Sequence, residues 1–537
     1  MATSLATPIR SEQLRRAEYR RERRFAAALA VPLTVVAALV HGYHPYAEDG
    51  GVYLPEIKRL LDPGLYPHGA EFVVGHLQYS LFAPMVAGLV RASGLSAEMV
   101  MLLVYLATFW MTLFAGWLLA ARCFGSREAR GGAMALLAAW MTLPIAGTSL
   151  MLMDPYVTAR SVSTPFGLLA LVGALEFLLP QFESSEGEMA ERRRGLVLCC
   201  GALAIAGVMH PLMGAYALGS VLLLGAALSS SRVMQIWGTV GLGLTAVAIA
   251  WGLQLSAAPE GEIYRRVVLT RSYWYLGEWH WYEWVGLVAP VAILLAIGLR
   301  QRRDEDAALV GMARMAAAAG AIAVAVALLF ARAGMKMHLV ARMQPLRIFQ
   351  VVYMVMILAV GAALGEWVLR RRPIRWVAVF SLLAGVTVAS ERRTYPASRH
   401  LELPDALAWR ISAGRENQFE EAFVWVRRNT PTDAVFALDA DYITKPGEDA
   451  QSFRAIAERS VLPDFSKDGG VVTNKPELAG EWLEGQAAQT GLDSEPDEER
   501  VRRLRPLGVS WVVLDRGAAT EFVCMYANDA VKVCRLP

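Results

Sequence analysis

The chain has 537 residues, of which 55% are hydrophobic and 19% are charged, and its formal net charge is +3. This composition is too apolar for a soluble protein of ordinary size and indicates a polytopic membrane protein. The net charge is too small to suggest a nucleic-acid partner, and we expect none.

The first 24 residues, MATSLATPIRSEQLRRAEYRRERR, are rich in arginine and precede an apolar stretch. No small-residue cleavage site follows that stretch, which argues against a signal peptide. We therefore expect residues 1–24 to form a cytoplasmic tail in front of an uncleaved first span.

Apolar segments predict a mostly α-helical membrane domain over residues 25–390, with about eleven spans. The segments are residues 25–43, 97–121, 131–151, 164–181, 195–210, 212–229, 234–253, 283–299, 312–332, 345–368 and 375–390. With the N-terminus inside, every short arginine cluster between these segments falls on the cytoplasmic side. An odd number of spans then places residues 391–537 outside, in the periplasm or the extracellular space.

The first outer loop, residues 44–96, is long enough to hold structure of its own. Its segment YLPEIKRLL predicts a short amphipathic helix. The later segment QYSLFAPMVAGLVRAS is apolar but is interrupted by Pro84. We expect this segment to lie in the membrane interface or to span it only partly, because a full crossing would move the next arginine cluster outside.

Beyond residue 391 the composition becomes that of a soluble domain, which we expect to be a small α/β unit. The end of the chain, FVCMYANDAVKVCRLP, predicts a hairpin around Asn528 and Asp529. If the turn spans residues 528–530, Cys524 and Cys534 face each other, and an oxidising compartment would permit a disulfide. A two-residue turn would shift the register and separate them, and both possibilities stay open.

Glu48 and Asp49 follow the first span and precede two glycines. Two interpretations compete: a solvated loop, or a carboxylate held at the membrane surface that acts as a general base or binds a divalent metal such as Mg²⁺ or Mn²⁺. Glycines allow a backbone to come close to a ligand, which favours the second. His44 lies nearby, as a metal ligand or as a hydrogen-bonding group at the interface.

A second outer loop, LMLMDPYVTARSVSTPFG, contains Asp154 and Arg160 between long apolar runs. The two side chains could pair with each other or cap the next helix. Alternatively, the Arg160 guanidinium binds a phosphate while Asp154 joins Asp49 in a catalytic or metal site.

A third outer segment, ARAGMKMHLVARMQPLRIFQ, concentrates positive charge where the usual bias disfavours it. Its candidate phosphate ligands are Lys336, Arg342 and Arg347. A lipid phosphate near the bilayer surface would account for these charges, and so would contacts between long side chains and lipid headgroups.

The aromatic loop RSYWYLGEWHWYEW, residues 271–284, precedes an apolar span. Such density is typical of an interfacial aromatic belt. The same faces would suit a sugar ring or an isoprenoid tail, and the candidate acceptor or sugar ligands are Trp279, His280, Trp281 and Tyr282.

The arrangement resembles the GT-C superfamily of polytopic glycosyltransferases, in particular its poorly characterised bacterial members. The resemblance lies in the order of elements and in short motifs: YAEDGGVY after the first span, MDPYVTARS in the second outer loop, MQPLRIFQ before a late span, and WVRRNTPTDAVFALD and FRAIAERSV in the terminal domain. The motifs EDGG and MDP depart from the acidic pairs of protein mannosyltransferases and oligosaccharyltransferases. Metal dependence and acceptor class therefore stay open.

The resemblance implies an enzyme of the bacterial cytoplasmic membrane that takes a sugar from a polyprenyl-phosphate donor. The acceptor, which would be a glycan, a lipid or a protein, is modified on the outer face among membrane lipids. By motif position, Asp49 becomes the catalytic base or metal-organising residue, with Glu48 as its substitute, and Asp154 the second acidic residue. Arg342 or Arg347 would contact the donor phosphate.

Two other classes of function remain. A non-catalytic scaffold or assembly subunit could retain the fold without the chemistry. A transporter is less favoured, because the spans hold few charges at mid-depth and show no convincing inverted repeat.

Overall fold

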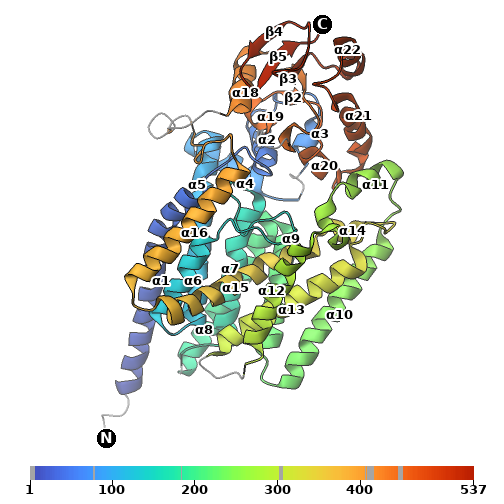
Figure 1. The fold of residues 1–537 in the computed structure, drawn as a ribbon. Helices are drawn as coiled ribbons and strands as arrows, with labels where there is room; N and C mark the ends of the chain where they lie inside the picture. Colours follow the sequence, from blue (N-terminus) through green and yellow to red (C-terminus); the bar gives the residue numbers. More distant parts are fainter. Residues whose placement is uncertain are drawn as a thin grey trace.

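The computed structural model describes residues 6–75, 79–182, 184–300, 306–404, 407, 417–444 and 452–537. Long helices form a membrane domain, and a small α/β domain lies at the end of the bundle opposite the start of α1 (Figure 1). We call the described part of residues 417–537 the C-terminal domain.

Within the described ranges, eight helical segments are long and apolar enough to cross a membrane. They are Tyr19–His41 of α1 (Ala6–His41), α5 (Ala97–Cys123), α7 (Ala159–Leu178), α10 (Arg232–Ser256), α12 (Trp281–Gly298), α13 (Ala307–Phe330), Leu339–Leu369 with α14 (Leu339–Arg342), η4 (Pro345–Ile348), α15 (Phe349–Ala363) and η5 (Leu364–Leu369), and α16 (Pro373–Thr394). The segments fit the expected multi-pass membrane protein.

The other three predicted spans do not meet those criteria. Helix α6 (Arg127–Ala139) has 13 residues, about 20 Å of helix against ~30 Å of hydrocarbon. Helix α8 (Ser185–Met209) begins with a run of charged residues, and α9 (Pro211–Ala227) has 17 residues. The total of eleven spans therefore stays a prediction.

Helix α7 lies at the centre of the bundle, and its outer end is firmly fixed. Thr158 caps the helix through a reciprocal hydrogen-bond pair with Ser161. Further along, a Cβ on Gly173 would lie 2.6 Å from the carbonyl oxygen of Gly195, so only glycine allows α7 and α8 to pack this closely. This packing holds the start of α7 at the outer end of the bundle.

The first outer loop is helical. The predicted amphipathic helix is confirmed as α2 (Gly50–Leu61), and it is followed by α3 (Ala70–Val73) and α4 (Phe82–Ser93). Helix α4 has 12 residues, or about 18 Å, so it is too short to cross a membrane by itself.

The C-terminal domain contains a five-stranded mixed sheet in the order β2-β1-β3-β5-β4. Its strands are β1 (Val435–Ala437), β2 (Ser460–Val461), β3 (Trp511–Asp515), β4 (Cys524–Ala527) and β5 (Val531–Arg535). Its helices are α18 (Gln418–Asn429), α19 (Phe453–Ala457), α20 (Lys467–Val472), α21 (Ala479–Gln489) and α22 (Asp497–Leu504). Two separate apolar cores, one involving α18 and α19 and the other α21 and α22, cover opposite faces of the sheet.

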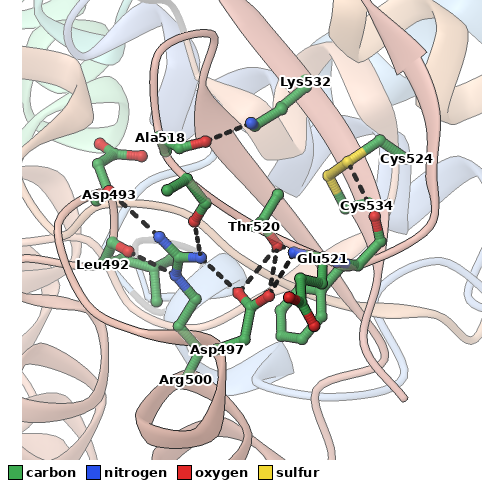
Figure 2. Close-up of polar contacts among 12 residues, drawn as sticks. Leu492, Asp493, Asp497, Arg500, Ala518, Thr520, Glu521, Cys524, Lys532 and Cys534 are labelled. Atoms are coloured by element: carbon green, nitrogen blue, oxygen red, sulfur yellow. Dashed lines mark hydrogen bonds and ion pairs between the residues drawn. A yellow bond between two sulfur atoms is a disulfide. The ribbon is translucent and has the colours of Figure 1, made fainter.

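The terminal hairpin turns over Asp529 and Ala530, because the Asn528 amide donates to the Val531 carbonyl at 3.0 Å, so the predicted three-residue turn is wrong. A bulge between Cys524 and Tyr526 restores the register that permits a disulfide. Cys524 is paired with Cys534 across β4 and β5, and the two form a disulfide (Figure 2). The turn is held by the Asn528 side chain, whose Oδ1 accepts hydrogen bonds from the backbone amides of Ala530 and Val531.

Beside the hairpin, a buried arginine fastens the loop between β3 and β4. Arg500 donates to the backbone carbonyls of Leu492, Asp493 and Ala519 and pairs with Asp497 (Figure 2). Asp497 in turn accepts a hydrogen bond from the Thr520 hydroxyl. The polar groups of this network satisfy one another, which suits a structural role.

Candidate functional site

Glu48 and Asp49 lie at the point where the first outer loop turns into α2. Glu48 has a φ of +49°, and Asp49 is the residue that caps α2, with its carbonyl accepting from the Val52 amide at 3.0 Å. The side chains of Glu48 and Asp49 are 52% and 44% exposed. Both carboxylates are therefore accessible to solvent.

The two glycines that follow are explained by packing within the chain. A Cβ on Gly50 would lie 3.1 Å from the Cβ of Tyr156 in the second outer loop. A Cβ on Gly51 would lie 2.3 Å from the Cβ of Ser452 in the C-terminal domain. The expected close approach is thus to two other parts of the protein, which meet at the start of α2, and it leaves no need for a ligand to explain the glycines.

Asp154 and Arg160 form a buried ion pair, as one of the two interpretations of this loop expected. Their side chains are only 3% and 5% exposed. Burial raises the pKa of Asp154, Arg160 opposes that shift, and the negative charge of Asp49 adds to it. The second outer loop therefore lies within electrostatic reach of Asp49, and a backbone hydrogen bond of 2.7 Å from His44 to Pro155 joins the two loops.

Arg347 brings a further positive charge to the same place. Its Nε donates to Oε1 of Gln344 at 2.7 Å, and it interacts electrostatically with Arg160 and Asp49. Its terminal amino groups make no hydrogen bond or ion pair with any residue in the described ranges. They are the groups of this site that are open to an anion.

Lys467, at the start of α20, completes the site from the C-terminal domain. Its ammonium pairs with Glu48 and lies 3.7 Å from Oδ1 of Asp49. Burial favours the neutral amine, but the charges of Glu48 and Asp49 outweigh it and raise the pKa of Lys467. Sequence analysis missed this residue, which is 419 positions from Glu48 and belongs to no recognisable motif.

We call these side chains the charged cluster: Glu48, Asp49, Asp154, Arg160, Arg347 and Lys467. It contains three carboxylates and three cations, so its formal charge is zero. Asp49 is its common member, because Lys467, Arg160, Arg347 and Asp154 all interact with it.

Two of the predicted phosphate ligands lie elsewhere. Arg342 donates to the carbonyl of Thr473 at 2.9 Å and to the hydroxyl of Tyr264 at 3.2 Å. Lys336 is exposed. Arg342 therefore fastens the C-terminal domain to the membrane domain, and the structure gathers neither residue into the charged cluster.

The aromatic loop divides into a buried and an exposed part. Trp279 is buried, packs against Gly147 and donates its indole hydrogen to the carbonyl of Tyr273. His280, Trp281 and Tyr282 are exposed at the start of the α12 span, with the rings of His280 and Tyr282 stacked at 5.3 Å. Their position suits an interfacial belt, and a role in sugar binding stays a prediction.

His44 is held by two carboxylates. Its Nε2 lies 2.8 Å from Glu391 and its Nδ1 lies 3.2 Å from Glu402, while its ring stacks on Tyr395. Burial lowers the pKa of His44, but the two carboxylates outweigh burial and raise it to about 9. The side chain is therefore a buried imidazolium at neutral pH, a state that cannot ligate a metal.

The predicted metal candidates do not form a group of ligands around one point. Among the described residues, no group of three or more His, Cys, Asp and Glu side chains is placed to hold a metal ion. Of the three metal candidates, His44 is bound by carboxylates and Asp154 is engaged by Arg160. Asp49 alone does not make a divalent site of the usual kind.

A cleft of about 770 Å³ lies next to the first outer loop, between the start of α5 and α18. Polar side chains of both signs line it, among them Glu98, Glu402 and Arg428, together with the rings of Tyr46 and Trp425. The side chains of the charged cluster do not line it, so we treat the cleft and the cluster as separate features.

No protein-family model and no curated protein matches the sequence. The function is therefore inferred from the charged cluster and its position at the end of the membrane domain that carries the C-terminal domain.

Proposed function

We propose that the protein is a membrane glycosyltransferase of the GT-C type, which moves a sugar from a polyprenyl-phosphate donor to an acceptor on the outer face of the bacterial cytoplasmic membrane. The observation that carries this proposal is the surrounding of Asp49. An accessible carboxylate stands beside the buried pair of Asp154 and Arg160 and beside the open guanidinium of Arg347. A carboxylate and a guanidinium within electrostatic reach of each other support the pairing of a base with an anion-binding group.

Asp49 acts as the general base. It takes the proton of an acceptor hydroxyl, whose oxygen attacks the anomeric carbon of the donor from the face opposite the phosphate. The bond between the anomeric carbon and the phosphate oxygen breaks, and its electron pair leaves with the polyprenyl phosphate. The products are an inverted glycoside and a polyprenyl phosphate, and Asp49 then returns its proton to water.

The phosphate of the donor binds at Arg347. Guanidinium groups suit phosphate because they offer parallel donors in a rigid plane. Arg160 adds positive potential without changing partners, since it is locked to Asp154. Both charges act in a poorly hydrated region, where they stabilise the leaving phosphate more strongly than they would in water.

Two independent features support the proposed membrane orientation. The short arginine clusters favour a cytoplasmic N-terminus. The Cys524–Cys534 disulfide belongs in an oxidising compartment, which supports an external C-terminal domain. A lipid-linked donor also fits that side, because nucleotide sugars are made in the cytoplasm.

We propose that the cations of the charged cluster, rather than a bound metal, stabilise the leaving phosphate. Among the described residues no group of three or more acidic, His or Cys side chains is placed to hold a metal ion, and the guanidinium of Arg347 can supply positive charge to the phosphate. We therefore expect chelators to leave the transfer rate unchanged.

One observation favours a second candidate, a scaffold that has kept the fold without the chemistry. The cluster is neutral, and Lys467 bridges Glu48 and Asp49 to the C-terminal domain. Such an arrangement would also serve to fasten two domains together.

Sugar transfer by the purified protein separates the two candidates. The protein is given a panel of polyprenyl-phosphate sugars and membrane acceptors, and wild type is compared with Asp49→Asn. Asp62→Asn, which changes an exposed aspartate at the other end of α2, is the matched control. We expect turnover in wild type and the control only. Equal turnover in Asp49→Asn removes Asp49 from the mechanism, and no turnover with any donor favours the scaffold.

A further inference from the structure

The segment that carries Lys467 is anchored at its backbone. The amide of Lys467 donates to Oδ1 of Asp464 at 2.5 Å. The next residue, Asp468, accepts hydrogen bonds from Arg454 on both carboxylate oxygens, at 2.6 and 2.8 Å. From the membrane domain, Arg271 donates to the carbonyl of Ser466 at 2.7 Å. The backbone is thus tied on both sides of Lys467, and only its side chain is left to move.

The side chain of Lys467 is the most readily released cation of the charged cluster. Arg160 is locked in a buried pair with Asp154. Lys467 is 15% exposed, and its partners, Glu48 and Asp49, are the two exposed carboxylates of the cluster. Because the two carboxylates are about half exposed, water can replace the ammonium at them, and the long stem of lysine lets that ammonium reach another partner.

An arriving phosphate would upset the charge balance of the cluster. The cluster is neutral while Lys467 rests on Glu48 and Asp49. A phosphate bound at Arg347 adds at least one negative charge beside Asp49, and this charge attracts the ammonium of Lys467.

We propose that Lys467 is a positioning residue that exchanges partners when the donor binds. In the free protein its ammonium rests against Glu48 and Asp49, and with the donor in place it moves to the phosphate. The exchange removes the ammonium of Lys467 from Asp49, whose carboxylate then accepts the acceptor proton. This inference rests on the proposed glycosyltransferase function and deepens it, because it makes the C-terminal domain part of the donor site.

The exchange makes base activity depend on the donor. Until a phosphate is present, the carboxylate of Asp49 is shared with an ammonium and is a poor partner for an acceptor hydroxyl. The donor must therefore bind first, and the acceptor second. If Lys467 only joined the two domains, it would impose no order of substrate binding.

Two variants with opposite expected effects test the exchange. Farnesyl phosphate is titrated into the full-length protein in lipid nanodiscs by calorimetry, with farnesol as the control that lacks a phosphate. Lys467→Met should weaken binding about tenfold, because a charge-assisted contact to the phosphate is lost. Glu48→Gln should tighten binding several-fold, because Lys467 loses a competing partner.

Matched variants separate a specific contact from a general change of charge. Lys475→Met removes another ammonium near α20, one whose contact is a 3.5 Å approach to the carbonyl of Glu71, and it should leave the affinity unchanged. Lys467→Arg should keep most of the affinity. A double variant of Glu48→Gln and Lys467→Met should bind as weakly as Lys467→Met alone.

The outcomes distinguish this inference from the proposed function. If wild type binds farnesyl phosphate no better than farnesol, both the donor class and the exchange are overturned. If binding depends on the phosphate but Lys467→Met matches Lys475→Met, only the exchange is overturned. Weaker binding in Glu48→Gln as well as in Lys467→Met would mean that the ion pair is merely structural, and would also overturn the exchange.

Discussion

Replacement of Arg160 with methionine is the sharpest test of how the candidate site is held together. Arg160 is 5% exposed and its partner Asp154 is 3% exposed, so the substitution leaves an uncompensated carboxylate in the protein interior. Loss of one partner from such a pair typically destabilises a fold by about 3 to 5 kcal/mol. We expect Arg160→Met to fall in this range.

A partly exposed pair provides the control. Arg192 and Glu188 lie 2.8 Å apart on α8, one turn from each other. Pairs of this kind contribute about 0.5 kcal/mol or less. Both variants are unfolded with increasing SDS in mixed micelles, with tryptophan fluorescence as the signal, and their free energies of unfolding are compared with wild type.

The stability of Arg160→Met should also depend on pH, and the direction of that dependence is a second test. Burial raises the pKa of Asp154 even with Arg160 present. Without Arg160 the pKa of the folded-state carboxyl rises further, and the folded protein binds that proton more tightly than the unfolded chain does. The loss of stability in Arg160→Met should therefore shrink as the pH falls through that folded-state value.

The reasoning is refuted if Arg160→Met costs no more than Arg192→Met. It is also refuted if the double variant of Asp154→Asn and Arg160→Met is no milder than Arg160→Met. With the carboxylate replaced by an amide, no charge remains buried, and part of the stability should return.

Three further outcomes follow from the contacts around the site. The carboxylate partners of His44 raise its pKa to about 9 against the effect of burial. The contribution of His44 to stability should therefore be complete below about pH 6.5 and be lost as the pH rises through about 9. Thermal melts of His44→Gln should lack this loss of stability at alkaline pH. Gly51→Ala places a Cβ against Ser452 and should lower the melting temperature. Adding Ser452→Gly should restore part of the lost melting temperature, and a double variant that melts no higher than Gly51→Ala would contradict the proposed clash. Cys524→Ser removes the disulfide with Cys534 and should lower the free energy of unfolding by about 3 kcal/mol, measured by denaturation. Reduction of the wild-type disulfide should lower it by the same amount and is the control.

The elements of the fold that depend on local sequence were predictable. Long apolar runs marked most of the spans, and the amphipathic pattern of YLPEIKRLL marked α2. The register of the terminal hairpin could not be predicted from its turn. Asp529 and Ala530 form a two-residue turn, and a bulge between Cys524 and Tyr526 is what brings Cys524 opposite Cys534.

The apolar segment over residues 131–151 is longer than the helix that it contains, because hydropathy does not record where a helix ends. Residues 131–151 are apolar enough to suggest a crossing, but α6 ends at Ala139 and the chain then folds into the second outer loop. That loop is where Asp154 pairs with Arg160. An apolar segment at a structured membrane surface can therefore resemble a span.

Most of the charged cluster was predictable, but Lys467 was not. Asp49, Asp154, Arg160 and Arg347 stood out because charges beside apolar runs are expensive and call for partners. Lys467 did not, because it sits in a polar stretch of a soluble domain, where a lysine is unremarkable. Its importance comes from the docking of that domain on the first outer loop, a long-range contact that no local pattern records.

The role of Asp49 is the central claim, and single-turnover sugar transfer tests it most directly. Donor is bound in advance, acceptor is added, and the rate of glycoside formation is compared between wild type, Asp49→Asn and Glu48→Gln. We expect Asp49→Asn to slow transfer by about 10² to 10⁴, while Glu48→Gln stays within about tenfold of wild type. Equal rates for wild type and Asp49→Asn, or a larger loss in Glu48→Gln than in Asp49→Asn, would contradict the assignment of the base.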